Sequence, residues 1–410
     1  MTYDILSVYS AHRFAEGLMA LHANPGGYVS PDQLIGRDRL IQRLWRILGR
    51  QSVLLTAERR MGKTSIINKM VAQPPSGGLY FYQDLEEVGS EVEFAEKVLD
   101  SIHSELSKKH RLVARARQLL EQVGGAEIRG VVKLPEGATQ DGMKLLQRMI
   151  EDLLEHHPGP VVFFWDEMPL MLHNLRTRSS DMAAMQVLDH LRALRQTQPR
   201  LRMVFTGSIG LHNVVISLRR AGHANAATND MHVQDVPPLA PKDAAELAHQ
   251  LLLGEQIATG DPPRLAGVIA SAVDGVPYFI HHIVEQLAQF GEPCDDETVH
   301  RIVDRHLTDA QDDWNLQYYR DRIDTYYSPD ESAIALAVLD VLAAAKRAVP
   351  LPKLLHLVGA RIPSDNEELI RGVLVRLQRD HYVEQDVSGT FRFRFPLIRR
   401  FWQAHRGLGA

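Results

Sequence analysis

The sequence lacks the features that mark several classes of protein. Its 410 residues include one cysteine, Cys294, so no disulfide can form within the chain, which is typical of proteins in a reducing cytosol. No window approaches 18 consecutive apolar residues, and the N-terminus has no basic stretch followed by an apolar run. These absences exclude a disulfide-stapled secreted domain and argue against a membrane span. We therefore expect a soluble, cytoplasmic protein.

An excess of either charge is also missing. Lys and Arg number 46 and Asp and Glu number 51, which gives a net charge of -5. This balance argues against a chain that coats nucleic acid along its whole length, but it leaves room for a local basic patch. With 45% hydrophobic residues, the chain has enough material for the cores of two to four domains.

Strand-like and helix-like segments alternate through the first 239 residues. Short β-prone runs occur at 52–56, 79–82, 161–165 and 201–206, with helical periodicity between them. The run at 161–165 is continuously apolar, as expected for a strand buried on both faces. This alternation predicts βαβ units around a parallel sheet.

The pattern changes after residue 240. Helical segments follow one another up to about 307, and prolines separate them. An aromatic-rich stretch at 311–330 is interpreted as a connector. Residues 331–410 predict three helices and a β-hairpin, in which phenylalanine and arginine alternate from Phe391 to Phe395.

One motif carries chemistry. Residues 57–65 read Ala-Glu-Arg-Arg-Met-Gly-Lys-Thr-Ser, which fits the phosphate-binding pattern Gly-x4-Gly-Lys-[Ser/Thr], with Ala57 in place of the first glycine. In such a loop, Gly62 permits close approach of the backbone, Lys63 reaches the β and γ phosphates, and Thr64 offers its hydroxyl to Mg²⁺. The loop stands between a β-prone run and an amphipathic helix, as the pattern requires. The alternative is an accidental Gly-Lys-Thr in a loop.

Two acids follow the apolar run at 161–165. Asp166 would hold Mg²⁺ through its water shell, and Glu167 would orient or deprotonate the attacking water. Without the loop, two acids that cap the next helix would be the ordinary interpretation. A hydroxyl in Thr206-Gly207-Ser208, for which we select Ser208, could bind the γ-phosphate or the water, or the segment could be a helix-capping turn.

Four segments together resemble the archaeal-type AAA-like ATPases, which are allied to the STAND signalling ATPases. They are Leu34-Ile35-Gly36-Arg37-Asp38, Glu58-Arg59-Arg60-Met61-Gly62-Lys63-Thr64-Ser65, Phe163-Phe164-Trp165-Asp166-Glu167 and Phe205-Thr206-Gly207-Ser208. The resemblance covers most of the chain from about residue 24. It implies that Ile35, Gly36 and Arg37 flank the adenine, and that Pro277 of Gly275-Val276-Pro277 lies against the nucleotide. Arg59, Arg60, Met61, Gly62, Lys63, Thr64 and Ser65 would form the phosphate site, although solvated Arg59 and Arg60 side chains are an equal alternative.

The resemblance implies an α/β fold: a parallel-sheet, AAA+-like P-loop NTPase core with a helical lid and a C-terminal winged-helix domain. The boundaries would be an N-terminal segment at 1–33, the core at 34–239, the lid and connector at 240–328 and the winged helix at 329–410. The implied function is a Mg²⁺-dependent, ATP-hydrolysing switch whose winged helix contacts a separate partner protein. A DNA-associated ATPase and a nucleotide-binding scaffold with little turnover remain alternatives, and an oligomer stays open.

Two departures from the family pattern predict slow turnover. Many relatives carry a Gly-Arg pair before the last core strand, a candidate arginine finger, where this chain has Asn229-Asp230. Arg219-Arg220 lie nearby and could substitute. The second-sensor arginine of the lid is also missing, and His281-His282 stand in that neighbourhood, where ordinary helix residues are the simpler interpretation.

The end of the chain is locally basic. Residues 388–410 contain five Arg and no acid, and the third predicted helix carries Arg371, Arg376 and Arg379. One interpretation places the wing, with Arg392 and Arg394, on a phosphate backbone. The other is that these arginines pair with acids of the lid or core and hold the domains together. The sequence leaves both interpretations open.

Overall fold

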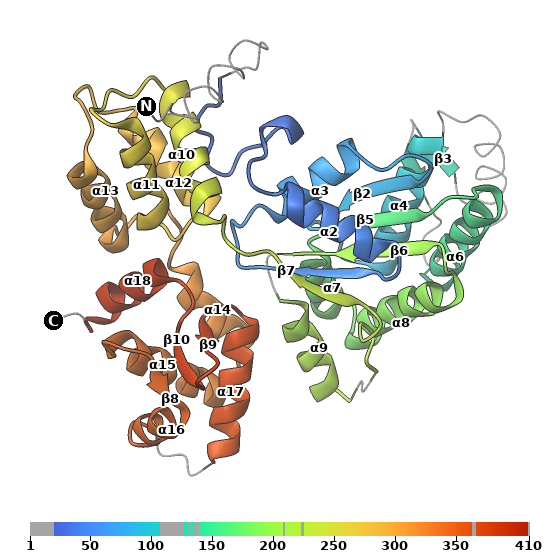
Figure 1. Cartoon of the computed structure of the whole chain (residues 1–410). Helices are drawn as coiled ribbons and strands as arrows, with labels where there is room; N and C mark the ends of the chain where they lie inside the picture. Colours follow the sequence, from blue (N-terminus) through green and yellow to red (C-terminus); the bar gives the residue numbers. More distant parts are fainter. Residues whose placement is uncertain are drawn as a thin grey trace.

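The computed structural model describes residues 20–106, 126–128, 131–133, 139–207, 210–222, 225–362 and 366–408. In Figure 1 these residues form a sheet-containing half and a helical half, and the chain passes from one to the other after the C-terminal end of β7. Of the predicted site residues, Ser208 alone lies outside the described part of the chain.

The first half is built on a parallel sheet. Its strand order is β2-β5-β6-β1-β7, and every neighbouring pair among these strands is parallel. The strands are β1 (Val53–Thr56), β2 (Leu79–Asp84), β5 (Val161–Asp166), β6 (Leu201–Phe205) and β7 (His232–Asp235). With the helical lid and C-terminal domain described below, this sheet confirms the predicted fold class.

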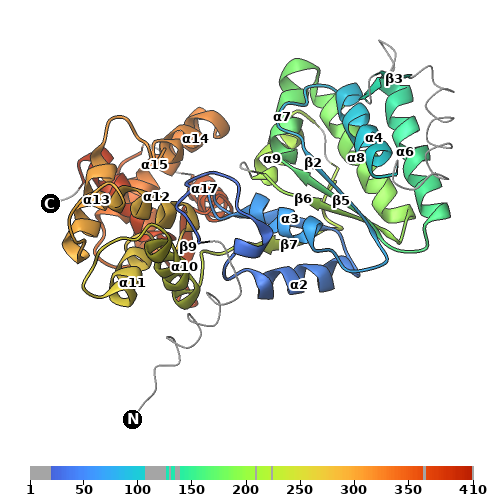
Figure 2. The same cartoon turned by 90° about the horizontal axis from the view of Figure 1, so that it is seen from above.

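Helices cover both faces of the sheet (Figures 1 and 2). The short 3₁₀ helix η1 (Pro31–Gln33) precedes α2 (Asp38–Leu48) and α3 (Lys63–Ala72), which pack on one face. The other face carries α4 (Glu91–Leu106), α6 (Thr139–His156), α7 (Met168–Arg178), α8 (Asp181–Thr197) and α9 (Leu211–Arg220). Because β5 lies between two neighbouring strands with helices on both faces, Phe164 packs into the first layer, and Phe163 and Trp165 pack into the second. This two-sided burial explains the continuous apolar run at 161–165. The strands β3 (Ala126–Ile128) and β4 (Val131–Lys133) pair as a separate antiparallel ribbon.

The lid consists of four helices: α10 (Pro241–Gly254), α11 (Pro262–Ala272), α12 (Pro277–Leu287) and α13 (Asp296–Thr308). Proline occupies the first turn of α10, α11 and α12, where a missing backbone N–H costs nothing. The side chains of Asp261 and Asp295 cap α11 and α13. The prolines that separate the segments in the sequence are therefore helix starts.

The C-terminal domain has the order helix, strand, helix, helix, hairpin, helix. The three helices and the hairpin predicted from the sequence are present, while the short strand after the first helix and the helix after the hairpin were not predicted. A further helix, α14 (Tyr318–Tyr326), lies in the predicted connector. The domain contains α15 (Pro329–Ala344), β8 (Val349–Pro350), α16 (Leu351–Gly359), α17 (Glu367–Arg379), β9 (Val383–Gln385), β10 (Thr390–Phe393) and α18 (Pro396–Arg406). The antiparallel strand order is β8-β10-β9. Phe391, Phe393 and Phe395 are all buried, as their alternation with arginine predicts.

A single hydrophobic cluster runs from α2 and α3 through the lid into the C-terminal domain. The other large cluster stays on the far face of the sheet. Among the described helices, none combines the length and the apolar character that a bilayer crossing needs.

The turn between α11 and α12 attaches the lid to the core. The carbonyl oxygen of Gly275 accepts a 3.0 Å hydrogen bond from the N–H of Leu239, which lies in the segment that leaves β7. Gly275 has φ of 69°, in the left-handed region, and a Cβ there would lie 2.8 Å from the carbonyl oxygen of Leu239. Glycine is therefore required by both the backbone angle and the close approach.

We predict that Gly275→Ala lowers the free energy of unfolding by about 2–3 kcal/mol, because left-handed strain adds to the backbone clash. Gly267→Ala is the matched control, since Gly267 lies in α11 with no atom within 4 Å of an added Cβ. That change should raise stability by about 0.5–1 kcal/mol through helix propensity. Urea denaturation of the full chain measures both. Equal stability of Gly275→Ala and the wild type would contradict the proposed requirement for glycine.

Candidate functional site

The phosphate-loop candidate joins β1 to α3. Gly62 caps α3 with φ of 82°, and an added Cβ would meet no atom within 4 Å, so the space beside its backbone is open. The Lys63 ammonium lies inside the loop and donates to the carbonyls of Ala57 and Glu58, each at 3.1 Å. Burial lowers the pKa of Lys63, while the charge of Glu58 opposes that shift. The loop thus encloses a positive charge at the N-terminus of a helix, as an anion site requires.

The predicted partners of the loop converge on it. The Thr64 hydroxyl donates a 2.6 Å hydrogen bond to Asp166 Oδ2, although the two residues lie 102 positions apart in the sequence. Asp166 is 3% exposed, and burial raises its pKa although Thr64 and the backbone N–H of Glu167 both donate to it. A buried carboxylate with this raised pKa gains from a nearby cation.

Glu167 lies beside Asp166 in a left-handed backbone conformation. Its φ is 54°, it caps α7, and its carboxylate lies beside Gly207, just after β6. The neighbouring Thr206 is 1% exposed, and its hydroxyl has no hydrogen-bond partner among the described residues. The segment Thr206-Gly207-Ser208 offers two hydroxyls, of which that of Thr206 is buried beside Glu167. The predicted Ser208 lies outside the described residues.

The oxygens at this edge of the sheet fit Mg²⁺. Thr64 and Asp166 offer a hydroxyl and a carboxylate, and Asp84 ends β2 directly opposite Asp166. The charge of Asp84 contributes to the raised pKa of Asp166. Mg²⁺ prefers oxygen ligands and keeps several waters, so a few carboxylates and one hydroxyl suffice. Asp84 was missed in the sequence because its role depends on strand pairing.

Ile35, Gly36 and Arg37 precede α2 at the border of the lid. The Arg37 guanidinium is 3% exposed and donates to the carbonyls of Met61 and Pro237, each at 2.8 Å. Burial lowers the pKa of Arg37 to about 10. Arg37 therefore fixes the phosphate loop to the segment that enters the lid. A role of this box beside the adenine stays a prediction.

The two loop arginines lie against aromatic rings and are not extended into solvent. The Arg59 guanidinium carbon is 4.3 Å from the Tyr318 ring centroid, and that of Arg60 is 3.9 Å from the Tyr278 centroid. Arg60 also donates to the carbonyl of Trp314. Tyr278 follows Pro277 at the start of α12, so this contact brings the Gly-x-Pro turn close to the phosphate loop. Contact between Pro277 and the nucleotide stays a prediction.

A buried charge network that no local sequence pattern predicts joins the loop to the C-terminal domain. Arg322 of α14 donates to both carboxylate oxygens of Glu58, at 2.8 and 3.0 Å. The same guanidinium contacts the carbonyl and carboxylate oxygens of Asp380, at 3.2 and 3.3 Å. The side chains of these three residues are at most 5% exposed. Contacts over 264 positions leave no local pattern in a sequence.

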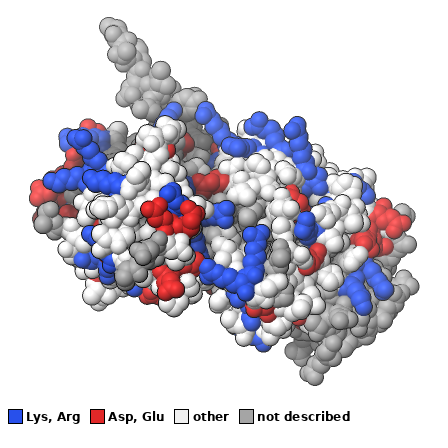
Figure 3. Space-filling model, turned by 90° about the horizontal axis from the view of Figure 1, so that it is seen from below, with Lys and Arg blue, Asp and Glu red and all other residues white. Residues whose placement is uncertain are grey.

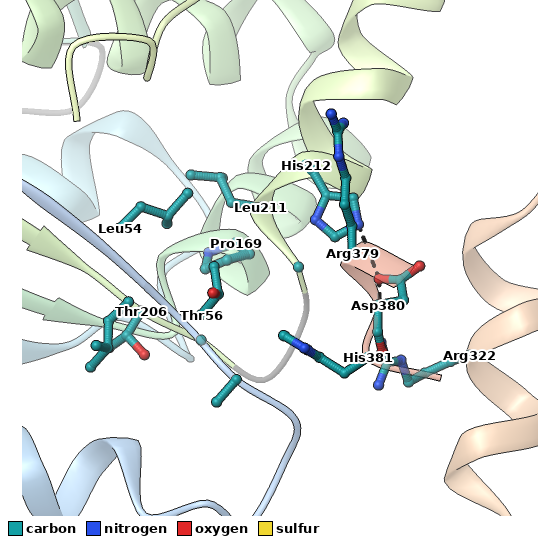
Figure 4. Close-up of a pocket in the computed structure, with 14 residues that line it drawn as sticks. Leu54, Thr56, Pro169, Thr206, Leu211, His212, Arg322, Arg379, Asp380 and His381 are labelled. Atoms are coloured by element: carbon teal, nitrogen blue, oxygen red, sulfur yellow. Dashed lines mark hydrogen bonds and ion pairs between the residues drawn. The ribbon is translucent and has the colours of Figure 1, made fainter. Parts of the chain in front are cut away.

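Asp380 is the centre of this network (Figure 4). It accepts 2.7 Å hydrogen bonds from the Tyr327 hydroxyl and the Asn213 amide, and His212 Nε2 lies 3.1 Å away. Burial alone would raise the pKa of Asp380, but the His212 bond and the Arg322 charge hold it well below its ordinary value. The Asp380 carboxylate, at the end of α17, therefore links the C-terminal domain to α9 of the core.

A small pocket lies between the core and the C-terminal domain. Figure 4 shows Thr56, Thr206 and Pro169 on one side and Arg379, Asp380 and His381 on the other. Its position at the carboxyl edge of the sheet is where parallel α/β folds bind ligands.

Asp230, at the predicted position of an arginine finger, is bound by an arginine of its own chain. Asp230 accepts from Arg195 at 2.8 and 2.9 Å, and the Arg195 side chain is 2% exposed. Of the possible substitutes, Arg220 pairs with Glu331 at 2.5 Å, and Arg219 is exposed with no ion pair among the described residues. His281 is buried and accepts from the N–H of Asn24, and burial lowers its pKa to about 4. His281 thus behaves as an ordinary helix residue.

The basic C-terminal tail pairs with acids of the chain. Arg392 binds Glu384 on the neighbouring strand at 2.6 Å, and Arg400 binds Asp304 of the lid at 2.5 Å. Arg394 binds Asp235 of the core at 2.5 Å. In α17, Arg376 is buried against Glu331 and Asn213, Arg371 pairs with Glu367 at 3.3 Å, and Arg379 lines the pocket. The contacts of Arg394, Arg400 and Arg376 join domains, as the domain-packing interpretation predicts, whereas Arg392 and Arg371 pair within their own hairpin and helix.

Known proteins resemble this chain over part of its sequence and in its fold. Residues 46–215 match a family model described as an AAA domain. The Walker-type ATPase PABY2304 of Pyrococcus abyssi has a similar fold, with a TM-score of 0.60 and 15% identity over 91% of this chain and 97% of that one. The ORC2 protein of Aeropyrum pernix, in its ADPNP–ADP complexes, matches with a TM-score of 0.51 and 14% identity over 96% and 97%. The comparison with curated proteins found no match.

We predict that Arg322→Met lowers the free energy of unfolding by about 3–5 kcal/mol, because it leaves Glu58 and Asp380 buried without their cation. Arg320→Met is the matched control on the same helix. Arg320 pairs with a 58% exposed Asp324, so its loss should cost about 1 kcal/mol or less. Denaturant titration measures both variants. Similar losses for the two would show that the Arg322 network contributes no more than a surface pair.

Proposed function

We propose that this chain, whose residues 46–215 match the model of an AAA domain, binds and hydrolyses ATP. The observation that carries the proposal is the 2.6 Å hydrogen bond between Thr64 and Asp166, with Glu167 next to it at the carboxyl edge of the sheet. A hydroxyl after the phosphate loop and a carboxylate after a distant strand form the pair that a metal–triphosphate complex needs.

Each residue of the site would have a separate role in ATP binding or hydrolysis. Backbone N–H groups and Lys63 would hold the phosphates, with Lys63 leaving the Ala57 and Glu58 carbonyls that now accept from it. Glu167 would orient the attacking water and take its proton, and the Thr206 hydroxyl would donate to the γ-phosphate or position the water. Thr64 and Asp166 would hold Mg²⁺, which neutralises charge on the phosphates when bound.

We further infer that the C-terminal domain senses the nucleotide. Glu58 is part of the phosphate loop, and Arg322 connects it to Asp380 at the end of α17. A triphosphate brings negative charge to a loop whose own acid is already paired with a buried arginine. Competition for Arg322 would weaken the hold on Asp380 and release the C-terminal domain to a separate partner protein. This makes the chain a nucleotide-dependent switch of the STAND kind.

Slow turnover is part of this proposal. Asp230 stands where relatives carry arginine and is bound to Arg195 of its own chain, so no finger is offered from that position. An arginine finger contributes about 10³–10⁵ to turnover in P-loop enzymes. A switch benefits from slow hydrolysis, because the lifetime of its ATP state sets the duration of the signal. A scaffold that binds nucleotide without turnover is the limiting case of the same site.

We predict that Glu167→Gln retains Mg²⁺-ATP binding and lowers turnover by about 10²–10⁴-fold, the loss expected for a general base. Steady-state phosphate release and calorimetric titration measure the two quantities separately. Glu87→Gln, an exposed acid after β2, is the matched control and should keep the wild-type rate. Wild-type turnover in Glu167→Gln would remove Glu167 from the mechanism.

Lys63→Ala tests the binding half of the same prediction. It removes a charge-assisted phosphate contact of about 1.5–3 kcal/mol, so ATP affinity should fall about tenfold or more. Lys69→Ala, in the same helix but paired with Asp38, should leave affinity unchanged. An unchanged affinity in Lys63→Ala would reject the phosphate-loop assignment.

We predict that ATP, held unhydrolysed by Glu167→Gln, raises hydrogen exchange in α14 and at the end of α17 relative to ADP. The reason is that both segments are held by the Arg322 network, which the triphosphate would loosen. Helix α16, which packs within the C-terminal domain, is the internal reference. Equal exchange with ATP and ADP would exclude the switch while leaving ATP hydrolysis intact.

A further inference from the structure

Helix α2 carries a row of arginines on one exposed face. Arg39, Arg43 and Arg46 lie in the helix, and Arg50 follows it by two residues. At about 100° per residue, positions 39, 43, 46 and 50 fall within an arc of about 60°. All four are exposed, and residues 39–52 contain no Asp or Glu.

These arginines lack the internal partners that other arginines of the chain have. Among the described residues, none of the four makes an ion pair, and Arg46 reaches only the carbonyl of Gln42 in its own helix, at 3.4 Å. The one acid of α2, Asp38, binds Lys69 at 2.9 Å. Figure 3 shows Lys and Arg side chains gathered along one edge of the molecule, with few acids between them.

The opposite face of α2 fixes the row in place. Ile41, Leu44 and Leu48 are buried against the sheet, and the Trp45 ring packs edge-on to Tyr80 and Phe164 at 5.3 and 6.0 Å. A helix anchored in this way presents its arginines as a straight, rigid row about 17 Å long. Rigid placement lowers the entropy cost of binding an extended partner.

We propose that the arginine row of α2 binds the phosphate backbone of a double-stranded nucleic acid. A duplex offers one charge about every 1.7 Å of its axis, so four guanidinium groups meet phosphates without an exact register. Guanidinium groups also bind phosphate oxygens in pairs. The contact reads no bases, and it is independent of the ATP site.

Two other anionic partners fit the row less well. Protein interfaces have an apolar centre, yet Gln42 and Gly49 flank the row on one side, and Leu40 and Ile47 on the other side are partly buried against the core. A membrane-surface helix would need exposed large apolar side chains, and those of α2 are turned into the core. Nucleic-acid interfaces are polar and strongly basic, as this face is.

The test uses the full chain and a fluorescein-labelled 30-base-pair duplex DNA, with an RNA duplex and poly-glutamate as further probes. The variant is Arg39→Gln with Arg43→Gln and Arg46→Gln. The matched control is Arg264→Gln with Arg371→Gln and Arg392→Gln, which removes the same charge from exposed arginines paired with Asp296, Glu367 and Glu384. This control also removes two arginines on which a winged-helix contact would depend. Calorimetry with ATP and the melting temperature confirm that both variants are folded.

Fluorescence anisotropy at several salt concentrations should show duplex binding by the wild type and at least about tenfold weaker binding by the α2 variant. The plot of log affinity against log salt should flatten by about 2.7, or 0.9 for each of three lost phosphate contacts. The control should keep wild-type affinity and slope. An absence of duplex binding at low salt, an equal loss in the control, or equal binding of poly-glutamate would each overturn the proposal.

Discussion

The guanidinium of Arg322 is the group on which the arrangement of the domains depends. A charge removed from water is stable only with partners, and here the partners are Glu58 from the phosphate loop and Asp380 from the C-terminal domain. Each of these acids in turn needs the arginine, because both are almost fully buried. If the loop, α14 or α17 moved away, the charged side chains left behind would be buried without a partner of opposite charge. The loop, α14 and α17 are therefore held as one unit.

This unit explains the other features of the site. Arg59 and Arg60 can lie over Tyr318 and Tyr278 because α14 and α12 are held against the loop. Arg37 secures the opposite side of the loop through the Met61 carbonyl. The candidate nucleotide site is thus built by the core, the lid and the C-terminal domain together. A ligand that moves the loop must disturb contacts in all three.

The sequence predicted the parts of the site that local chemistry determines. The loop, its helix and the strand before Asp166 follow from residue order within short windows, and the structure brings Thr64 and Asp166 together as expected. The parallel sheet followed from the alternation of strands and helices, and the rest of the fold class followed from the family resemblance. Asp84, Arg322 and Asp380 were missed because their roles arise from strand pairing and from domain contacts between distant residues. The spacing of apolar residues in a sequence gives no information about contacts between distant residues.

The basic tail shows why composition alone was insufficient. An acid-free stretch suggested a free charged surface, yet Arg394 and Arg400 find their acids in Asp235 and Asp304, far away in the chain. The four arginines of α2 were less conspicuous in the sequence, since the helical turn that aligns them also separates them with apolar residues. A count of charges in a window measures neither pairing nor alignment.

Because Glu58 and Arg322 are 264 positions apart in the sequence, they are synthesised at different times. The phosphate loop leaves the ribosome 264 positions before the arginine that its acid requires, which is about 10–50 s at about 5–20 residues per second. During that interval the core can form its sheet, but the Glu58 carboxylate lacks its Arg322 partner and stays hydrated. The nascent core therefore cannot close its loop as the finished protein does. A nucleotide pocket with its native shape arises only after the C-terminal domain has been made and docked.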